Sequence, residues 1–294
     1  MAPNMSANAD VAAPPPPAPP TPLRRVLVRP ERRWRLPDLA AVWRYRELLW
    51  RLALRDIRVR YKQTVLGVAW AIVQPLCAMA VFTAISHFAR IATDGVRPEV
   101  FYYCGLVIWL LFANAMTSAG NSLLGSQHLI TKVYFPRIVL PVASVVTAVM
   151  DFAIAFVVLL VMMLATGVRP AAQIVLVPLF VALACVTALS FGLWLSALAT
   201  QFRDVRHMAP FLVQLWLFCT PVLYPSSAVG GGWKKVVLDL NPMSAIVDGF
   251  RWCVLGRSPP GLSALALGIT TVVVVLGSAL YYFQRVDRTL ADRI

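Results

Sequence analysis

The sequence has few of the groups with which enzymes carry out acid–base or metal chemistry. Its 294 residues include 13 Asp and Glu, three His and five Cys. The cysteines occur singly, with no CxxC pair, and His87, His128 and His207 lack the spacing of metal ligands. No GxxxxGKS or GxxxxGKT motif occurs, so the chain has no P-loop to hold ATP phosphates. These absences favour a conduit over a catalyst, and we expect no metal or cofactor to bind this chain.

Apolar residues, by contrast, are in large excess. They make up 59% of the sequence against 14% charged residues, and the mean hydropathy is +0.71, as in integral membrane proteins. About 20 apolar residues cross a hydrocarbon core of about 30 Å. We therefore predict an all-α integral membrane protein with six transmembrane helices, the fifth being the shortest: Val65–Ala89, Phe101–Leu124, Ile138–Ala165, Ile174–Ala199, Met208–Leu223 and Leu262–Phe283.

The net charge of +14 would suit a nucleic-acid partner, but the distribution of the basic residues indicates membrane topology instead. Of the 27 Lys and Arg, 20 lie in segments on one side of the predicted membrane and seven on the other. This is the positive-inside bias, and it places both termini in the cytoplasm. A seventh span over Val236–Leu255 would break this parity and would bury Asp248 and Arg251 at membrane depth, which is costly. We favour an outer-face segment over residues 226–256, either re-entrant or interfacial.

Two stretches outside the spans have a distinct character. Residues 1–41 are rich in Pro and Ala and then basic, and we expect them to be disordered. Residues 42–62 alternate apolar and arginine-rich faces at helical spacing, which predicts an amphipathic helix in the membrane interface with its arginines near anionic headgroups. The transmembrane domain then covers residues 63–285, and residues 286–294 form a cytoplasmic tail.

Between the second and third spans lies Ser126–Arg137, SQHLITKVYFPR, which is too short and too polar to cross a bilayer. Leu129, Ile130, Val133 and Tyr134 fall on one face of a short helix that Pro136 would end. An apolar face in this position must rest on something. The pattern alone leaves open whether that is the headgroup layer or a protein partner.

Asp151 is the one carboxylate near the middle of a predicted span. Burying an ionisable group in a bilayer is expensive, so this residue is either functional or paired inside the bundle. Gln74, Asn114 and Gln214 are its possible partners in the other spans. The second span also carries a polar stripe, Asn114, Ser118 and Asn121, which suits either a wet path or close helix packing.

Several stretches, in this order, resemble the membrane subunits of ABC-2-type polysaccharide exporters, the family that exports O-antigen and teichoic acid. Together they extend over Arg44–Arg285, about four-fifths of the chain. The matching stretches are RDIRVRYKQTVLGVAWAIVQP (55–75), GLVIWLLFANAMTSAGNSLL (105–124), LITKVYFPRIVLP (129–141), MDFAIAF (150–156), RDVRHMAPFL (203–212), TPVLYP (220–225) and LNPMSAIVDGFRW (240–252).

The resemblance implies the ABC-2 (type V exporter) permease architecture, with six helices per subunit and a homodimer whose conduit lies at the two-fold interface. It implies two copies of a separate ABC ATPase, which binds ATP and Mg, and a lipid (undecaprenyl)-linked polysaccharide as substrate in the cytoplasmic membrane. The segment after the second span would dock into the ATPase through His128, Leu129, Ile130, Lys132, Val133, Tyr134, Phe135, Pro136 and Arg137. The gate helix would end in Arg55, Asp56, Arg58, Arg60 and Tyr61.

Asp151 occupies the position of the family's third-helix aspartate. Aromatic rings in a sugar conduit can face pyranose C–H groups, and amides and hydroxyls can bind sugar hydroxyls. Our candidate channel-lining residues are accordingly Trp70, Phe82, Asn114, Ser118, Asn121, Trp216 and Tyr224.

The sequence does not identify the glycan. Frequent Ala and Arg suggest a GC-rich genome, which favours an O-antigen-like glycan over teichoic acid. A self-contained secondary transporter would need paired ionisable residues at the midplane, and Asp151 stands alone there. A membrane-embedded polysaccharide-modifying enzyme is disfavoured by the few carboxylates on the outer segments.

Overall fold

In the described part of the chain, all regular secondary structure is helical. The computed structural model describes residues 39–62, 67, 69–91, 93–133, 135–230, 232–257 and 259–287. These residues belong to one compact unit, Leu36–Ile294, and contain helices and no strand, which confirms the all-α prediction. Most of the predicted disordered segment, and residues 288–294 of the predicted tail, lie outside the described residues.

Five of the predicted spans are long helices. By length and composition, five helices could cross a membrane, α7 being counted together with the short 3₁₀ turn before it. Their apolar runs carry few charges, and the helical backbone makes its own hydrogen bonds, as a segment in lipid requires. These helices are α3 (Ala69–Ala89), α4 (Pro98–Gly125), α6 (Val139–Thr166), α7 (Val177–Ala199) and α11 (Leu262–Asp287).

The remaining helices are shorter. Two of them, α1 (Leu39–Arg44) and α2 (Arg46–Lys62), cover the predicted interfacial segment, and α5 (Gln127–Lys132) lies between α4 and α6. The predicted fifth span is α8 (Val205–Phe218), whose 14 residues extend about 21 Å at 1.5 Å per residue. It is therefore shorter than the predicted span and ends in turns over residues 219–223.

The alternative seventh span is wrong. Residues 236–255 are divided at Asn241 between α9 (Trp233–Leu240) and α10 (Pro242–Leu255). The Asn241 side chain accepts a hydrogen bond from the Met243 amide at 3.1 Å, and Pro242 occupies the first turn of α10. An N-cap followed by proline starts a new helix, so neither helix is long enough to cross a membrane.

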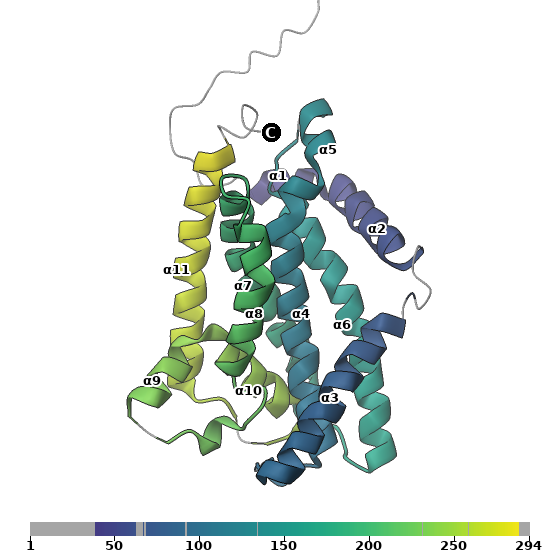
Figure 1. The fold of residues 1–294 in the computed structure, drawn as a ribbon, viewed down its shortest axis with the longest axis vertical. Coiled ribbons are helices and arrows are strands. Elements are labelled where there is room, and N and C mark those ends of the chain that lie inside the picture. Colours follow the sequence, from purple (N-terminus) through teal and green to yellow (C-terminus); the bar gives the residue numbers. More distant parts are fainter. Residues whose placement is uncertain are drawn as a thin grey trace, which may run out of the picture. The chain divides into compact units, whose positions relative to one another are not determined.

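Successive helices run between two opposite ends of this unit. Figure 1 shows α1, α5 and the C-terminal end of α11 at one end, which we call the α5 end, and α9 and α10 at the other, the α10 end. Helix α8 leads from the α5 end towards α9 and α10 although it is short. The described chain thus starts and finishes at the α5 end, which is consistent with the predicted even number of passes.

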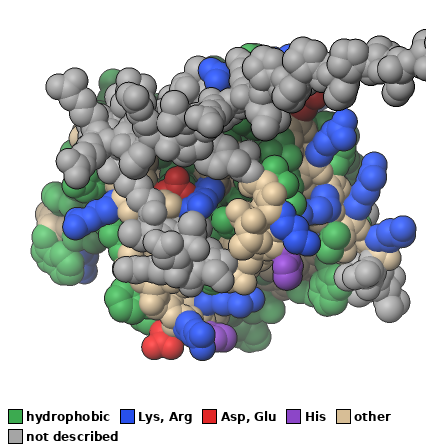
Figure 2. All heavy atoms as spheres, turned by 90° about the horizontal axis from the view of Figure 1, so that it is seen from above, with side chains coloured by type: hydrophobic (Ala, Val, Ile, Leu, Met, Phe, Trp, Pro, Cys, Tyr) green, Lys and Arg blue, Asp and Glu red, His purple; other side chains and the backbone are tan. Residues whose placement is uncertain are grey.

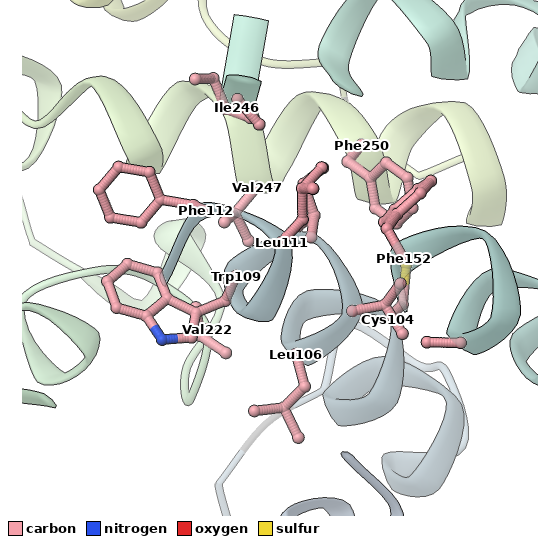
Figure 3. Packing of buried hydrophobic residues seen from close by; sticks show 14 of the residues in the cluster. Cys104, Leu106, Trp109, Leu111, Phe112, Phe152, Val222, Ile246, Val247 and Phe250 are labelled. Carbon is pink, nitrogen blue, oxygen red and sulfur yellow. The ribbon is translucent and has the colours of Figure 1, made fainter. Parts of the chain in front are cut away.

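Helix α4 lies at the centre of the packing. It contacts α3, α6, α7, α8 and α10, and 83% of its apolar 18-residue stretch is buried inside the protein. Lipid offers no hydrophobic driving force between helices, so such packing depends on close approach at small residues. Gly192 of α7 provides it, because a Cβ there would lie 2.7 Å from the Cβ of Ala119. Figure 3 shows Phe112, Phe152, Val247 and Phe250 in the resulting core.

A second close approach, at Gly249, generates a stability prediction. A Cβ on Gly249 would lie 2.0 Å from the Phe180 ring, so Gly249→Ala must displace either that buried ring or α10 itself. We expect a loss of about 1–3 kcal/mol in the free energy of unfolding, measured by SDS titration of the detergent-solubilised protein.

The matched control is Gly277→Ala in α11, where a Cβ meets nothing within 4 Å. Alanine favours helix over glycine, so this variant should be neutral or slightly more stable. Equal destabilisation by the two substitutions would contradict the packing argument.

Candidate functional site

Asp151 is paired with the end of the interfacial helix α2. Arg60 Nη1 donates to Asp151 Oδ2, and the Tyr61 hydroxyl donates to Asp151 Oδ1. Arg60 Nη2 also lies 3.5 Å from the Ser118 hydroxyl on α4. The sequence left the partner of Asp151 open, and the structure gives it Arg60 and Tyr61 instead of the possible partners Gln74, Asn114 and Gln214. The carboxylate is held by a cation and a phenol from outside the predicted spans.

The local sequence explains why α2 reaches this point. Leu52 and Ala53 are buried on one face of α2, while Arg51, Arg55 and Arg58 are exposed on the others. Packing of that apolar face against α6 brings the last turn of α2 over the middle of the span. Burial and the hydrogen bond to Asp151 raise the pKa of Tyr61, because both favour the protonated phenol.

Arg60 separates two hollows under α2. One is a cavity of about 280 Å³ that Arg60 lines together with Trp70, Gln74, Asn114 and Asp151. The other is an open groove of about 470 Å³, lined by Arg60 and by hydroxyls and amides of α4 and α6, among them Ser118, Asn121 and Ser144. The polar stripe of α4 therefore faces these two hollows.

The segment after α4 has an outward and an inward half. His128, Lys132 and Val133 are exposed, whereas Leu129 and Ile130 are half-buried against the chain's own core. Phe135 is only 6% exposed. It belongs to a group that we call the α5-end cluster, which includes Leu52, Leu123, Phe135, Leu140 and Phe283. Tyr134 lies outside the described residues, and the docking role of the segment stays a prediction.

Polar contacts fasten the inward half to the last helix. Arg137 Nη1 donates to the Asp287 backbone oxygen at 2.6 Å and lies 3.0 Å from its carboxylate. Pro136 is half-buried beside Phe135. The loop between α5 and α6 is thus tied to α2 by apolar packing and to α11 by an ion pair, so a displacement of α5 would reach both helices.

The other candidate residues occupy different surroundings. Arg55 and Asp56 form a local ion pair at 2.9 Å, and Arg58 is exposed. Phe82 packs near Tyr102 with ring centroids 6.3 Å apart. Trp216 packs edge-on against Phe112 and Phe191 and donates to Asn241 at 3.0 Å, which fixes α8 to its neighbours.

A buried cation, which the charge pattern of the sequence marks only as an outer-face residue, lies at the α10 end. Arg251 is 5% exposed, and its guanidinium lies 3.8 Å from the Phe101 ring centroid. It donates to the backbone oxygens of Pro221 and Val222, the latter at 2.7 Å. These contacts hold the turns after α8 against α10 and α4. Burial raises the pKa of Asp248, which lies near Arg251 on α10. Tyr224 lies half-buried in the turns after α8.

These features contain no nucleophile–base pair, and no group of three or more potential metal ligands occurs in the described ranges. Long apolar helices with polar hollows between them are compatible with a membrane transport subunit. Residues 47–255 match the family model described as ABC-2 type transporter, which covers more than two-thirds of the chain. The chain belongs to this family and is a multi-pass membrane protein.

Named relatives extend over most of the chain. The O-antigen export system permease protein RfbA of Myxococcus xanthus is 29% identical over 255 residues, covering 86% of this chain and 97% of that protein. A protein of the same name from Klebsiella pneumoniae is 27% identical, with coverages of 70% and 79%. The polysialic acid transport protein KpsM of Escherichia coli is 23% identical, with coverages of 78% and 90%. The predicted resemblance is confirmed.

The pairing of Arg60 with Asp151 can be measured by a double-mutant cycle with Arg60→Met and Asp151→Leu. The two side chains are 37% and 15% exposed, so the pair is only partly screened by solvent. We expect a coupling of about 1–3 kcal/mol in the free energy of unfolding.

The neighbouring pair Arg55 and Asp56 supplies the control, because its side chains are 45% and 34% exposed. The same cycle there should give about 0–0.5 kcal/mol. A coupling at Arg60 no larger than that at Arg55 would show that the contact does not hold α2 to α6.

Proposed function

We propose that this chain is the permease subunit of an ATP-driven exporter that moves a lipid (undecaprenyl)-linked polysaccharide out across the cytoplasmic membrane. Family membership supports transport, and the names of the relatives support a polysaccharide cargo. One observation supports the idea that this chain forms the path while a separate chain hydrolyses ATP. The chain has no P-loop, and its loop after α4 has an exposed face on which a partner could bind, while Phe135 anchors the same loop in the core.

The partner is an ABC ATPase, present in two copies that bind ATP and Mg. Its closure would displace α5 through His128, Lys132 and Val133. Phe135 would pass that displacement to Leu52 of α2, two turns from Arg60 and Tyr61, and Arg137 would pass it to α11. The contact at Asp151 is therefore where the movement of α2 would alter the cavity beneath it.

The conduit lies between two copies of this chain. Helix α8 supports this arrangement, because a stripe at helical spacing, Met208, Phe211, Leu212 and Leu215, is exposed and apolar. Helix α3 is exposed as well, because only 11% of its apolar 18-residue stretch is buried inside the protein. A homodimer would cover part of these faces and leave the remainder to lipid or to the polymer.

The α5 end is the cytoplasmic side, with both termini there. Figure 2 shows many Lys and Arg and few Asp and Glu on this face. The exposed basic residues of the described helices and loops here are Arg44, Arg46, Arg51, Arg55, Arg58, Lys62, Lys132, Arg203, Arg206 and Arg285. Such a bias marks cytoplasmic loops. It also places α2 where its arginines meet anionic headgroups.

The glycan is O-antigen-like, as in the first relatives; teichoic acid or another surface glycan is the alternative within the family. Deleting the gene should remove one surface glycan and cause its lipid-linked form to accumulate inside the cell, as followed by membrane extraction and sugar analysis. Unchanged surface glycans in the deletion strain would contradict export of a polysaccharide. Transport without any ATPase would favour a secondary transporter.

The two halves of the α5 segment give opposite predictions. Lys132→Glu with Val133→Asp changes only exposed side chains, so it should reduce co-purification of the ATPase while leaving the unfolding midpoint unchanged. Phe135→Ala empties a buried site and should lower the free energy of unfolding by about 3–5 kcal/mol.

Both variants should lose export, one by detachment and the other by uncoupling or instability. Co-purification of the ATPase and SDS titration, both carried out on the same preparations, distinguish detachment of the ATPase from loss of stability. Full retention of the ATPase by the Lys132 and Val133 variant would place docking elsewhere.

A further inference from the structure

The cavity beneath α2 contains polar groups that the protein itself does not use. Gln74 is exposed and Asn114 half-exposed on the wall of the 280 Å³ cavity. Within the described part of the chain, neither carboxamide has a hydrogen-bond partner. Both belong to candidate spans, where unpaired polar groups are costly unless they line a wet path or meet a ligand. Their position on a cavity therefore indicates a ligand that hydrogen-bonds.

The charges on the cavity wall exclude an anion as the preferred ligand. Among the described lining residues only Arg60 and Asp151 are charged, and they are paired with each other. Tyr61 adds a second donor to the same carboxylate. A phosphate would have to compete with Asp151 for Arg60 and would then lie beside an uncompensated carboxylate. A neutral ligand meets no such cost.

Trp70 defines the chemistry of the ligand further. Its side chain is 53% exposed and lines the cavity together with the polar groups, one helical turn from Gln74 on α3. An aromatic face beside hydrogen-bonding amides matches a pyranose, which has C–H groups on its faces and hydroxyls around its rim. A cavity of about 280 Å³ lies at the lower end of ligand-site volumes, which suits one sugar unit and not a polymer segment.

We propose that this cavity is a subsite for one neutral sugar unit of the transported glycan. Trp70 stacks on the ring, and Gln74 and Asn114 read its hydroxyls. Arg60, Tyr61 and Asp151 form a wall without net charge. Because α2 supplies Arg60 and Tyr61, the subsite changes shape when α2 moves. This inference rests on the proposed function and assigns sugar selection to the cytoplasmic half of the path.

The test uses the full chain with its ATPase in nanodiscs. The probe is the host's own surface glycan, released by mild acid and freed of lipid and phosphate. Saturation-transfer NMR should detect its binding to the wild type. Trp70→Ala and Asn114→Leu should each weaken binding about tenfold, as expected for loss of an anchoring contact. Trp70→Tyr should retain most of it.

Trp233→Ala provides the matched control, because Trp233 is 73% exposed on α9 at the α10 end. It should bind the glycan like the wild type. Inorganic pyrophosphate should not compete with the glycan. The proposal is overturned if the glycan does not bind, if the Trp70 and Asn114 variants bind it normally, or if pyrophosphate displaces it.

Export in cells separates this inference from the proposed function. If deleting the gene leaves every surface glycan in place, the proposed function fails and the subsite fails with it. If deletion removes a glycan and the double variant Trp70→Ala with Asn114→Leu restores it fully, the subsite alone is wrong. Unfolding midpoints equal to the wild type, measured first, ensure that lost export by the variants reflects binding.

Discussion

Close approach of α7 to α4 is the constraint on which the rest of this molecule depends. Helices in lipid are not driven together by apolar surface, so they pack where small residues let backbones meet. Gly192 and Ala119 provide that contact, and α4 becomes enclosed on most of its surface. Because one side of α4 is filled by α7, its polar stripe faces the opposite direction. Asn114 and Ser118 therefore line the hollows under α2.

Helix α2 connects these hollows to the α5 end of the bundle. Leu52 packs in the α5-end cluster with Phe135, and Arg60 reaches Asp151 near the middle of α6. Helix α2 packs along α6 between these two points. In the proposed transporter it would link the site where an ATPase would push to the site where a sugar would bind.

Sequence periodicity identified the elements well and their contacts poorly. The long apolar runs became five bilayer-length helices, and the polar, helically spaced segment at residues 126–137 became α5 and its loop. Leu129 and Ile130, however, face the chain's own core, because the apolar face of a short helix takes the nearest partner available. The sequence around Arg60 does not distinguish it from the other arginines of α2 that are expected near lipid headgroups, since no local pattern shows that the end of α2 lies over α6. The fifth predicted span became the shorter α8 because its helix ends at residue 218, before the apolar run does.

Hydropathy and charge alone determined that the chain is a multi-pass helical membrane protein with a basic side, because crossing lipid requires long apolar helices and topology follows Lys and Arg. The ordered motifs added the family. Only the tertiary structure decided which polar groups meet. The pairing of Asp151 with Arg60 and Tyr61, the burial of Arg251 and the cavity beside Trp70 each bring together residues that are distant in the chain. Such encounters depend on how close helices can pack at single glycines, which no local pattern of hydrophobicity records.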